Sequence, residues 1–117
     1  MIVAAVDDLL FSSKIRNAAR QAGVECVFAR SADAVLDEVR ARRPALVLFD
    51  LDAERIRPLE ALERLRAEPE LAATPTLGFV SHVHAALIQA ARAGGIGEVL
   101  PRSAFVASLP DIVAGAK

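Results

Sequence analysis

The 117-residue chain contains no tryptophan, no tyrosine and a single cysteine, and its only lysines are Lys14 and Lys117, beside twelve arginines. Because Cys26 has no second cysteine to pair with, the chain cannot form an internal disulfide, which suits a reducing compartment. No apolar run approaches the roughly 18 residues of a membrane span. The N-terminal residues MIVAAVDD lack a basic leader and turn acidic early, unlike a signal peptide. We therefore expect a cytoplasmic protein without a membrane segment.

An excess of charge of one sign is also lacking. The formal net charge is -1, with 25% charged and 54% hydrophobic residues, which is typical of a globular protein. This balance gives no electrostatic reason to expect binding to nucleic acid or to an anionic membrane. A chain of this length can bury a hydrophobic core without disulfides. We expect residues 1–117 to form one domain.

Short apolar runs alternate with longer amphipathic stretches along the whole chain. The apolar runs predict strands over residues 2–6, 24–29 and 45–49, a fourth that ends at Val80, and a fifth over 96–100. The amphipathic stretches predict helices over residues 9–23, 31–42, 57–68, 84–95 and 103–114. Strands joined through helices pair in parallel by right-handed crossovers. The predicted fold is a flavodoxin-like α/β three-layer sandwich, with a five-stranded parallel sheet of order 2-1-3-4-5 and five helices.

Acidic residues follow two of these strands directly. Asp7 and Asp8 follow the first strand and Asp50 follows the third, and in the predicted order these strands are neighbours. Three carboxylates packed together repel one another unless a cation lies among them. Mg²⁺ takes oxygen ligands and often shares them with a phosphoryl group, and a carboxylate beside it can attack phosphorus. Ser81 after the fourth strand and Arg102 after the fifth have the right chemistry to share the transferred charge.

Four motifs together resemble the receiver domains of two-component response regulators, of the chemotaxis-regulator kind. They are VDD (6–8), LVLFD (46–50), VS (80–81) and GIGEVLPR (95–102). The resemblance implies that Asp50 is the phosphoacceptor and that Asp7, Asp8 and Asp50 hold Mg²⁺. It also implies that Ser81 is the switch hydroxyl. The partners implied are a histidine kinase or phosphotransfer protein and a downstream protein target.

The chain departs from the receiver pattern on the side opposite the acids. Receivers carry a lysine after the fifth strand, whereas here no lysine lies between residues 14 and 117. Arg102 is the best candidate for that position, with Pro101 one residue away. Arginine keeps the charge, but its planar guanidinium cannot reproduce the contact of a compact ammonium. The aromatic switch residue falls at Val99, and His82 replaces the small residue after Ser81, where we expect it to crowd the entrance.

Two functional interpretations follow from this mixture of kept and lost residues. In the first, the chain is a stand-alone, atypical receiver that is phosphorylated on Asp50 and acts through a protein partner. It would catalyse at most its own phosphorylation and dephosphorylation. In the second, it is a pseudo-receiver that binds its partner without phosphorylation. In either case the predicted elements over 84–95, 96–100 and 103–114 form the surface that the family uses for docking, and a homodimer through this surface is a further hypothesis.

The Asp-x-Asp of residues 50 and 52 also resembles the nucleophile motif of haloacid dehalogenase-type phosphatases. In that family the first aspartate attacks phosphate and the second acts as the acid. Here the motif follows the third strand instead of the first, Ala53 and Glu54 replace the usual Gly-Thr, and the downstream lysine is absent. We therefore rank this interpretation a distant third. In a receiver, Asp52 would instead lie at the edge of the site.

Overall fold

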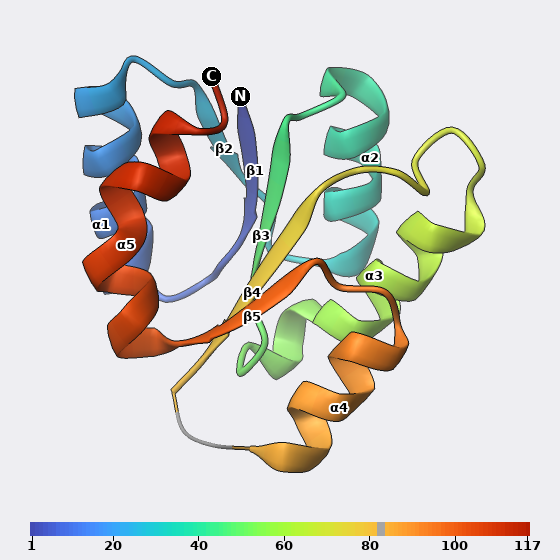
Figure 1. The fold of residues 1–117 in the computed structure, drawn as a ribbon. Coiled ribbons are helices and arrows are strands. Elements are labelled where there is room, and N and C mark those ends of the chain that lie inside the picture. Colours follow the sequence, from blue (N-terminus) through green and yellow to red (C-terminus); the bar gives the residue numbers. More distant parts are fainter. Residues whose placement is uncertain (82–83) are drawn as a thin grey trace.

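The computed structural model describes residues 1–81 and 84–117 and contains one five-stranded sheet (Figure 1). Its strands are β1 (Ile2–Ala5), β2 (Cys26–Phe28), β3 (Leu46–Asp50), β4 (Thr76–Val80) and β5 (Glu98–Pro101). Their order is β2-β1-β3-β4-β5, and every neighbouring pair is parallel. The predicted topology is confirmed. The boundaries differ by one or two residues: β1 and β2 end one residue before their apolar runs, and β3 and β5 end one residue beyond theirs.

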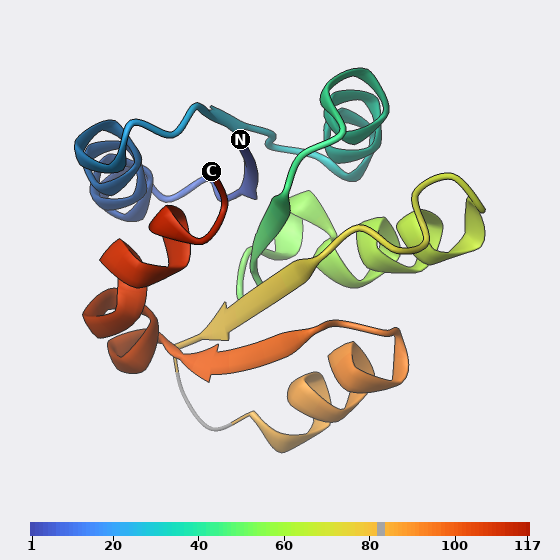
Figure 2. The same cartoon turned by 45° about the horizontal axis from the view of Figure 1, so that its top comes forward.

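Helices cover both faces of this sheet. They are α1 (Leu9–Ala22), α2 (Ala32–Arg42), α3 (Pro58–Ala67), α4 (Ala85–Ala93) and α5 (Arg102–Ala114), with a 3-10 turn, η1, over Glu54–Ile56. Helices α1 and α5 pack together on one face, and α2, α3 and α4 lie on the other (Figure 2). None of the helices within the described residues is long and apolar enough to cross a membrane. The predicted three-layer sandwich is therefore confirmed.

Local sequence signals explain where the helices begin and end. The Asp8 carboxylate accepts hydrogen bonds from the N–H groups at the start of α1, and Ser31 does the same for α2. Gly23 ends α1 in the left-handed conformation, with φ of 70°, which glycine adopts without strain. Pro58 is the first residue of α3, where its missing N–H costs no hydrogen bond. Helix α5 begins at Arg102, one residue earlier than predicted.

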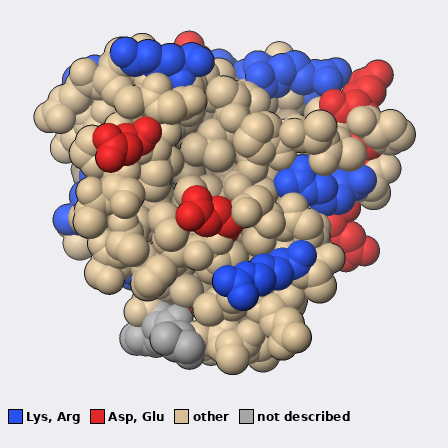
Figure 3. Space-filling model, in the orientation of Figure 1, with Lys and Arg blue, Asp and Glu red and all other residues tan. Residues whose placement is uncertain are grey.

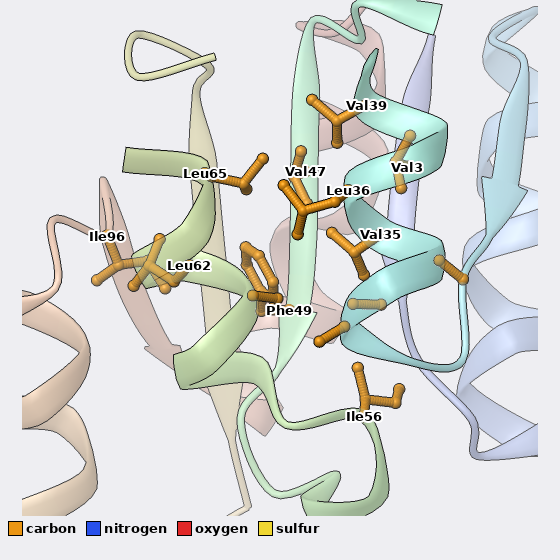
Figure 4. Close-up of a cluster of buried hydrophobic side chains, with 14 of the residues drawn as sticks. Val3, Val35, Leu36, Val39, Val47, Phe49, Ile56, Leu62, Leu65 and Ile96 are labelled. Carbon is orange, nitrogen blue, oxygen red and sulfur yellow. The ribbon is translucent and has the colours of Figure 1, made fainter. Parts of the chain in front are cut away.

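Alternate residues of the strands point to opposite faces of the sheet and belong to two separate cores. Val3, Val47 and Phe49 point toward α2 and α3, where they pack with Leu36 and Leu62 (Figure 4). The opposite core, under α1 and α5, contains three phenylalanines. Phe79 stacks on Phe105 with 4.2 Å between ring centroids, and Phe11 stacks on Phe79 at 5.4 Å. These rings lie directly beneath the carboxyl end of β4 and carry part of the site described next.

Charged groups are scattered over the molecular surface. On the face shown in Figure 3, basic and acidic groups form small separate patches on a largely uncharged surface. This agrees with the net charge of -1, and that face offers no broad basic area of the kind that binds nucleic acid.

Candidate functional site

The acidic residues predicted from the sequence lie at the carboxyl edge of the sheet. Asp50 is the last residue of β3, is only 3% exposed, and pairs in register with Phe79 of β4. Asp7 and Asp8 follow β1, which is hydrogen-bonded to β3. In parallel sheets, ligands bind in the crevice beyond the carboxyl ends of the strands. The fold therefore places Asp7, Asp8 and Asp50 in the region where a site is expected.

Two hydrogen bonds from backbone N–H groups to carboxylates tie the loop after β3 to the end of β4. The Asp52 N–H donates to Asp50 Oδ1 at 3.0 Å. The Ser81 N–H in turn donates to Asp52 Oδ2 at 2.6 Å. Ser81 thus contributes its backbone N–H to the site, and the residue itself is exposed. Asp52 lies at the edge of the site as predicted, and it connects the two strands as well.

Arg102 supplies the cation of the site. Its Nη2 lies 3.6 Å from Asp50 Oδ2 and 3.9 Å from Asp52 Oδ2. The same guanidinium lies over the ring of Phe11, 4.3 Å from the centroid, with Phe79 further away at 5.9 Å. Its Nε is buried and has no hydrogen-bond partner within residues 1–81 and 84–117. A stacked guanidinium is fixed in position, so Arg102 faces the two carboxylates from an aromatic platform.

These neighbours determine the acidity of Asp50. Burial raises the pKa of the Asp50 carboxyl above its ordinary value, because the charged form loses its water. The Asp52 N–H and the Arg102 guanidinium oppose this rise, whereas the carboxylates of Asp52 and Asp7 add to it. The net direction is upward. The cation therefore offsets only part of what burial costs the Asp50 anion.

The carboxylates are not gathered around one point. Asp8 Oδ1 accepts hydrogen bonds from the N–H groups of Leu10, at 2.8 Å, and Phe11, at 3.1 Å, so it is occupied as the cap of α1. Asp7 is half-buried and lines a recess of about 230 Å³ with Arg30 and Arg55. Within residues 1–81 and 84–117, no group of three or more His, Cys, Asp or Glu residues could hold a metal ion. The donor types suit Mg²⁺, but their present arrangement does not fit it.

No family model and no curated protein matches this sequence. Solved structures match it over almost its whole length. The phosphorylated cyanobacterial phytochrome response regulator RcpA superposes with a TM-score of 0.81 at 22% identity, covering 97% of this chain and 88% of that chain. The chemotaxis response regulator CheY4 of Vibrio cholerae gives 0.83 at 16% identity, covering 99% and 97%. The Mn²⁺-bound form of response regulator Rcp1 gives 0.79 at 19%, covering 97% and 88%.

This chain has the receiver-domain fold. Within that fold, Asp50 occupies the end of the third strand, and Arg102 comes directly after the fifth. Val99, where the aromatic switch residue was expected, is a half-buried residue of β5 that packs against the core under α4. His82 lies outside the described residues, so its expected crowding of the entrance stays a prediction. His84 precedes α4 and is exposed.

The aromatic platform under Arg102 is the feature that the sequence did not predict. Phe11, Phe79 and Phe105 come from three elements that are distant along the chain, and each alone has the pattern of an ordinary core residue. The sequence contained only an indirect signal for this platform. Phe79 lies in register with Asp50, and Phe11 lies three residues after Asp8, so both rings had to end near the acids. This inference needs the strand register, which apolar periodicity alone does not provide.

Proposed function

We propose that this chain is a receiver module of two-component signalling in which Asp50 accepts a phosphoryl group. The donor would be a histidine kinase or phosphotransfer protein, and the output would pass to a protein partner. The observation that carries the proposal is the position of Asp50, buried at the carboxyl end of β3 with the Arg102 guanidinium 3.6 Å from Oδ2. The phosphorylated state in which RcpA was solved supports the same chemistry for this fold.

The transfer uses groups of the site and of the donor, together with a proton from solvent. A carboxylate oxygen of Asp50 attacks phosphorus, and a new P–O bond forms as the P–N bond of the donor phosphohistidine breaks. The electron pair of that bond leaves with the imidazole nitrogen, which is protonated from solvent. The Arg102 guanidinium lies where it can donate hydrogen bonds to the phosphoryl oxygens and balance their charge. Asp50 acts as the nucleophile only when it is ionised, so its raised pKa opposes transfer at acidic pH.

Magnesium binding by Asp7, Asp8 and Asp50, which the resemblance implies, stays a prediction. The Mn²⁺-bound form of Rcp1 supports divalent-metal binding by that protein's receiver fold. In this chain a metal ion would have to compete with Arg102 for Asp50. Action in the cytoplasm, by residues 1–117 as one module, likewise stays a prediction.

We further propose that partners dock on the surface formed by α4, β5 and α5. The outer side of α4 is hollowed by a recess of about 750 Å³ lined by Ala85, Ile88, Gln89, Arg92 and Ala93. The small side chains of Ala85 and Ala93 allow another surface to approach closely.

The same surface would carry a homodimer. Sedimentation velocity of the wild type and of Ile88→Arg would detect this dimer as a concentration-dependent species that the variant lacks.

Incubation with acetyl phosphate, followed by intact mass measurement, tests the phosphoacceptor proposal. We expect a mass gain of about 80 Da in the wild type and none in Asp50→Asn. Asp52→Asn is the matched control, because it removes a carboxylate of the same site and should keep the adduct. No adduct at any donor concentration would contradict the proposal and leave the phosphorylation-independent pseudo-receiver. An adduct lost in Asp52→Asn but kept in Asp50→Asn would also contradict it.

A further inference from the structure

Arg102 differs from the other arginines of the described residues in what surrounds it. Arg40, Arg42, Arg43, Arg57 and Arg64 pair with acidic side chains on the surface. The Arg102 side chain is 29% exposed, lies over an aromatic ring and faces two carboxylates of the candidate site. It also buries an Nε for which the described part of the chain offers no hydrogen-bond partner. An arginine that served only as a surface charge would keep its Nε–H in water, because burying an unpaired donor costs free energy.

We propose that Arg102 is the built-in counter-cation of the acid site and takes the charge-balancing place of a divalent metal ion. The inference rests on the proposed function, because it concerns the same residues, and it adds how the site is regulated. The charge of a guanidinium is permanent, whereas that of a bound metal depends on its concentration. The Arg102 charge therefore balances that of one carboxylate of the site in the resting state, without any ion from solution.

The contacts of Asp50 show what a metal ion would have to displace. Oδ1 accepts the N–H of Asp52, and Oδ2 faces the Arg102 guanidinium. Asp8 is occupied by the first N–H groups of α1. Mg²⁺ demands near-octahedral geometry and gives up its waters reluctantly. At Asp50 it would therefore have to compete with the Asp52 N–H and the Arg102 guanidinium.

Arginine suits the counter-cation role better than the lysine typical of receivers, because its guanidinium stacks on an aromatic ring. The planar guanidinium lies 4.3 Å from the centroid of the Phe11 ring, and this contact holds it against the carboxylates. A metal ion that entered beside Asp50 would meet a cation that stacking keeps in place. Like charges a few ångströms apart repel strongly in a partly buried site. The stack therefore makes the neutralisation by Arg102 persistent.

A titration with Mn²⁺ tests this inference without any phosphodonor. Paramagnetic broadening of the amide signals of residues 7, 8 and 50 reports metal bound at the acid site. We expect no selective broadening in the wild type at sub-millimolar Mn²⁺. We expect Arg102→Gln to bind at least about tenfold more tightly, because the repelling cation is gone. Arg20→Gln, which removes an exposed arginine near the end of α1 and changes the net charge equally, should behave as the wild type.

Two further results keep the test decisive. Arg102→Lys keeps the charge but loses the stack, and its metal affinity should lie between those of the wild type and Arg102→Gln. Selective sub-millimolar binding by the wild type itself would overturn the inference even if Arg102→Gln failed to fold. Equal affinity in the wild type and Arg102→Gln would overturn it as well. Because no phosphoryl group is involved, these outcomes do not depend on whether Asp50 is ever phosphorylated.

Discussion

At the scale of single residues, the site combines one buried acid with one fixed cation. The sequence predicted Asp50 and Arg102 as site residues because each lies at the carboxyl end of an apolar run, and parallel strands end at a common edge. In the structure Asp50 is the last residue of β3 and Arg102 directly follows β5. The metal-binding role that the resemblance implies for Asp8 stays a prediction. In the structure its Oδ1 caps α1. An aspartate just before a helix is also a typical N-cap, so the sequence carried both signals.

Replacing Asp50 with Asn should raise thermal stability at neutral pH. The pKa of Asp50 is raised by folding, so the folded chain binds the proton more tightly than the unfolded chain does. The free energy of unfolding therefore falls as pH rises from about 4, the ordinary pKa of aspartate, through the raised value. Melting temperatures of the wild type and Asp50→Asn between pH 3 and 8 check this. The rise in melting temperature of Asp50→Asn over the wild type should shrink toward pH 3. A rise that is the same at every pH would contradict this prediction.

At the scale of elements, the helix caps and the packing of the last two strands decide how the site is held. The sequence pattern predicted all five strands and all five α-helices. The signal was strongest for β1, β3 and β4, which are buried on consecutive positions, whereas β2 and β5 are only partly buried. The aromatic platform could not be predicted in this way. It depends on which residue of β4 lies beside Asp50 and on how α1 and α5 pack together, and both are set by tertiary contacts.

The cap of α1 is expected to stabilise the chain as well as the site. Asp8→Ala removes two hydrogen bonds to the N–H groups of the first turn and should lower the free energy of unfolding by about 1 kcal/mol. Ser31→Ala, which removes the single side-chain bond at the start of α2, is the matched control and should cost a similar or smaller amount. Urea denaturation measures both. If Asp8→Ala were neutral while Ser31→Ala destabilised, the cap would not be the main role of Asp8.

The turn before β5 lies so close to β4 that we expect no side chain to fit at Gly97. A Cβ there would lie 2.5 Å from the carbonyl oxygen of Thr76, which belongs to the backbone and cannot move aside alone. Gly97→Ala should therefore destabilise the chain by about 1–3 kcal/mol. Gly115→Ala is the control, since its Cβ would lie 3.5 Å from its nearest neighbour and its φ is -71°. Equal stability of the two variants in urea would contradict the packing described here.

At the scale of the whole molecule, the fold separates the core from the chemistry. Two cores hold the sheet between its helix layers, and the charged site lies at the carboxyl edge, where the strands end. The receiver fold alone does not assign a phosphoryl-transfer role, because folds host many functions and the site must carry the argument. In this chain the proposed chemistry belongs to Asp50 together with Arg102, and the receiver and pseudo-receiver hypotheses differ in whether Asp50 becomes phosphorylated.

Locating the phosphoryl group along the chain is the most direct test of this account. After incubation with acetyl phosphate and quenching in acid, cleavage at Arg42 and Arg55 releases residues 43–55, which contain both Asp50 and Asp52. Fragment ions that break the chain between these residues assign the added mass of about 80 Da. The account predicts that the mass lies on Asp50. A group on Asp52, or on a peptide elsewhere in the chain, would contradict it.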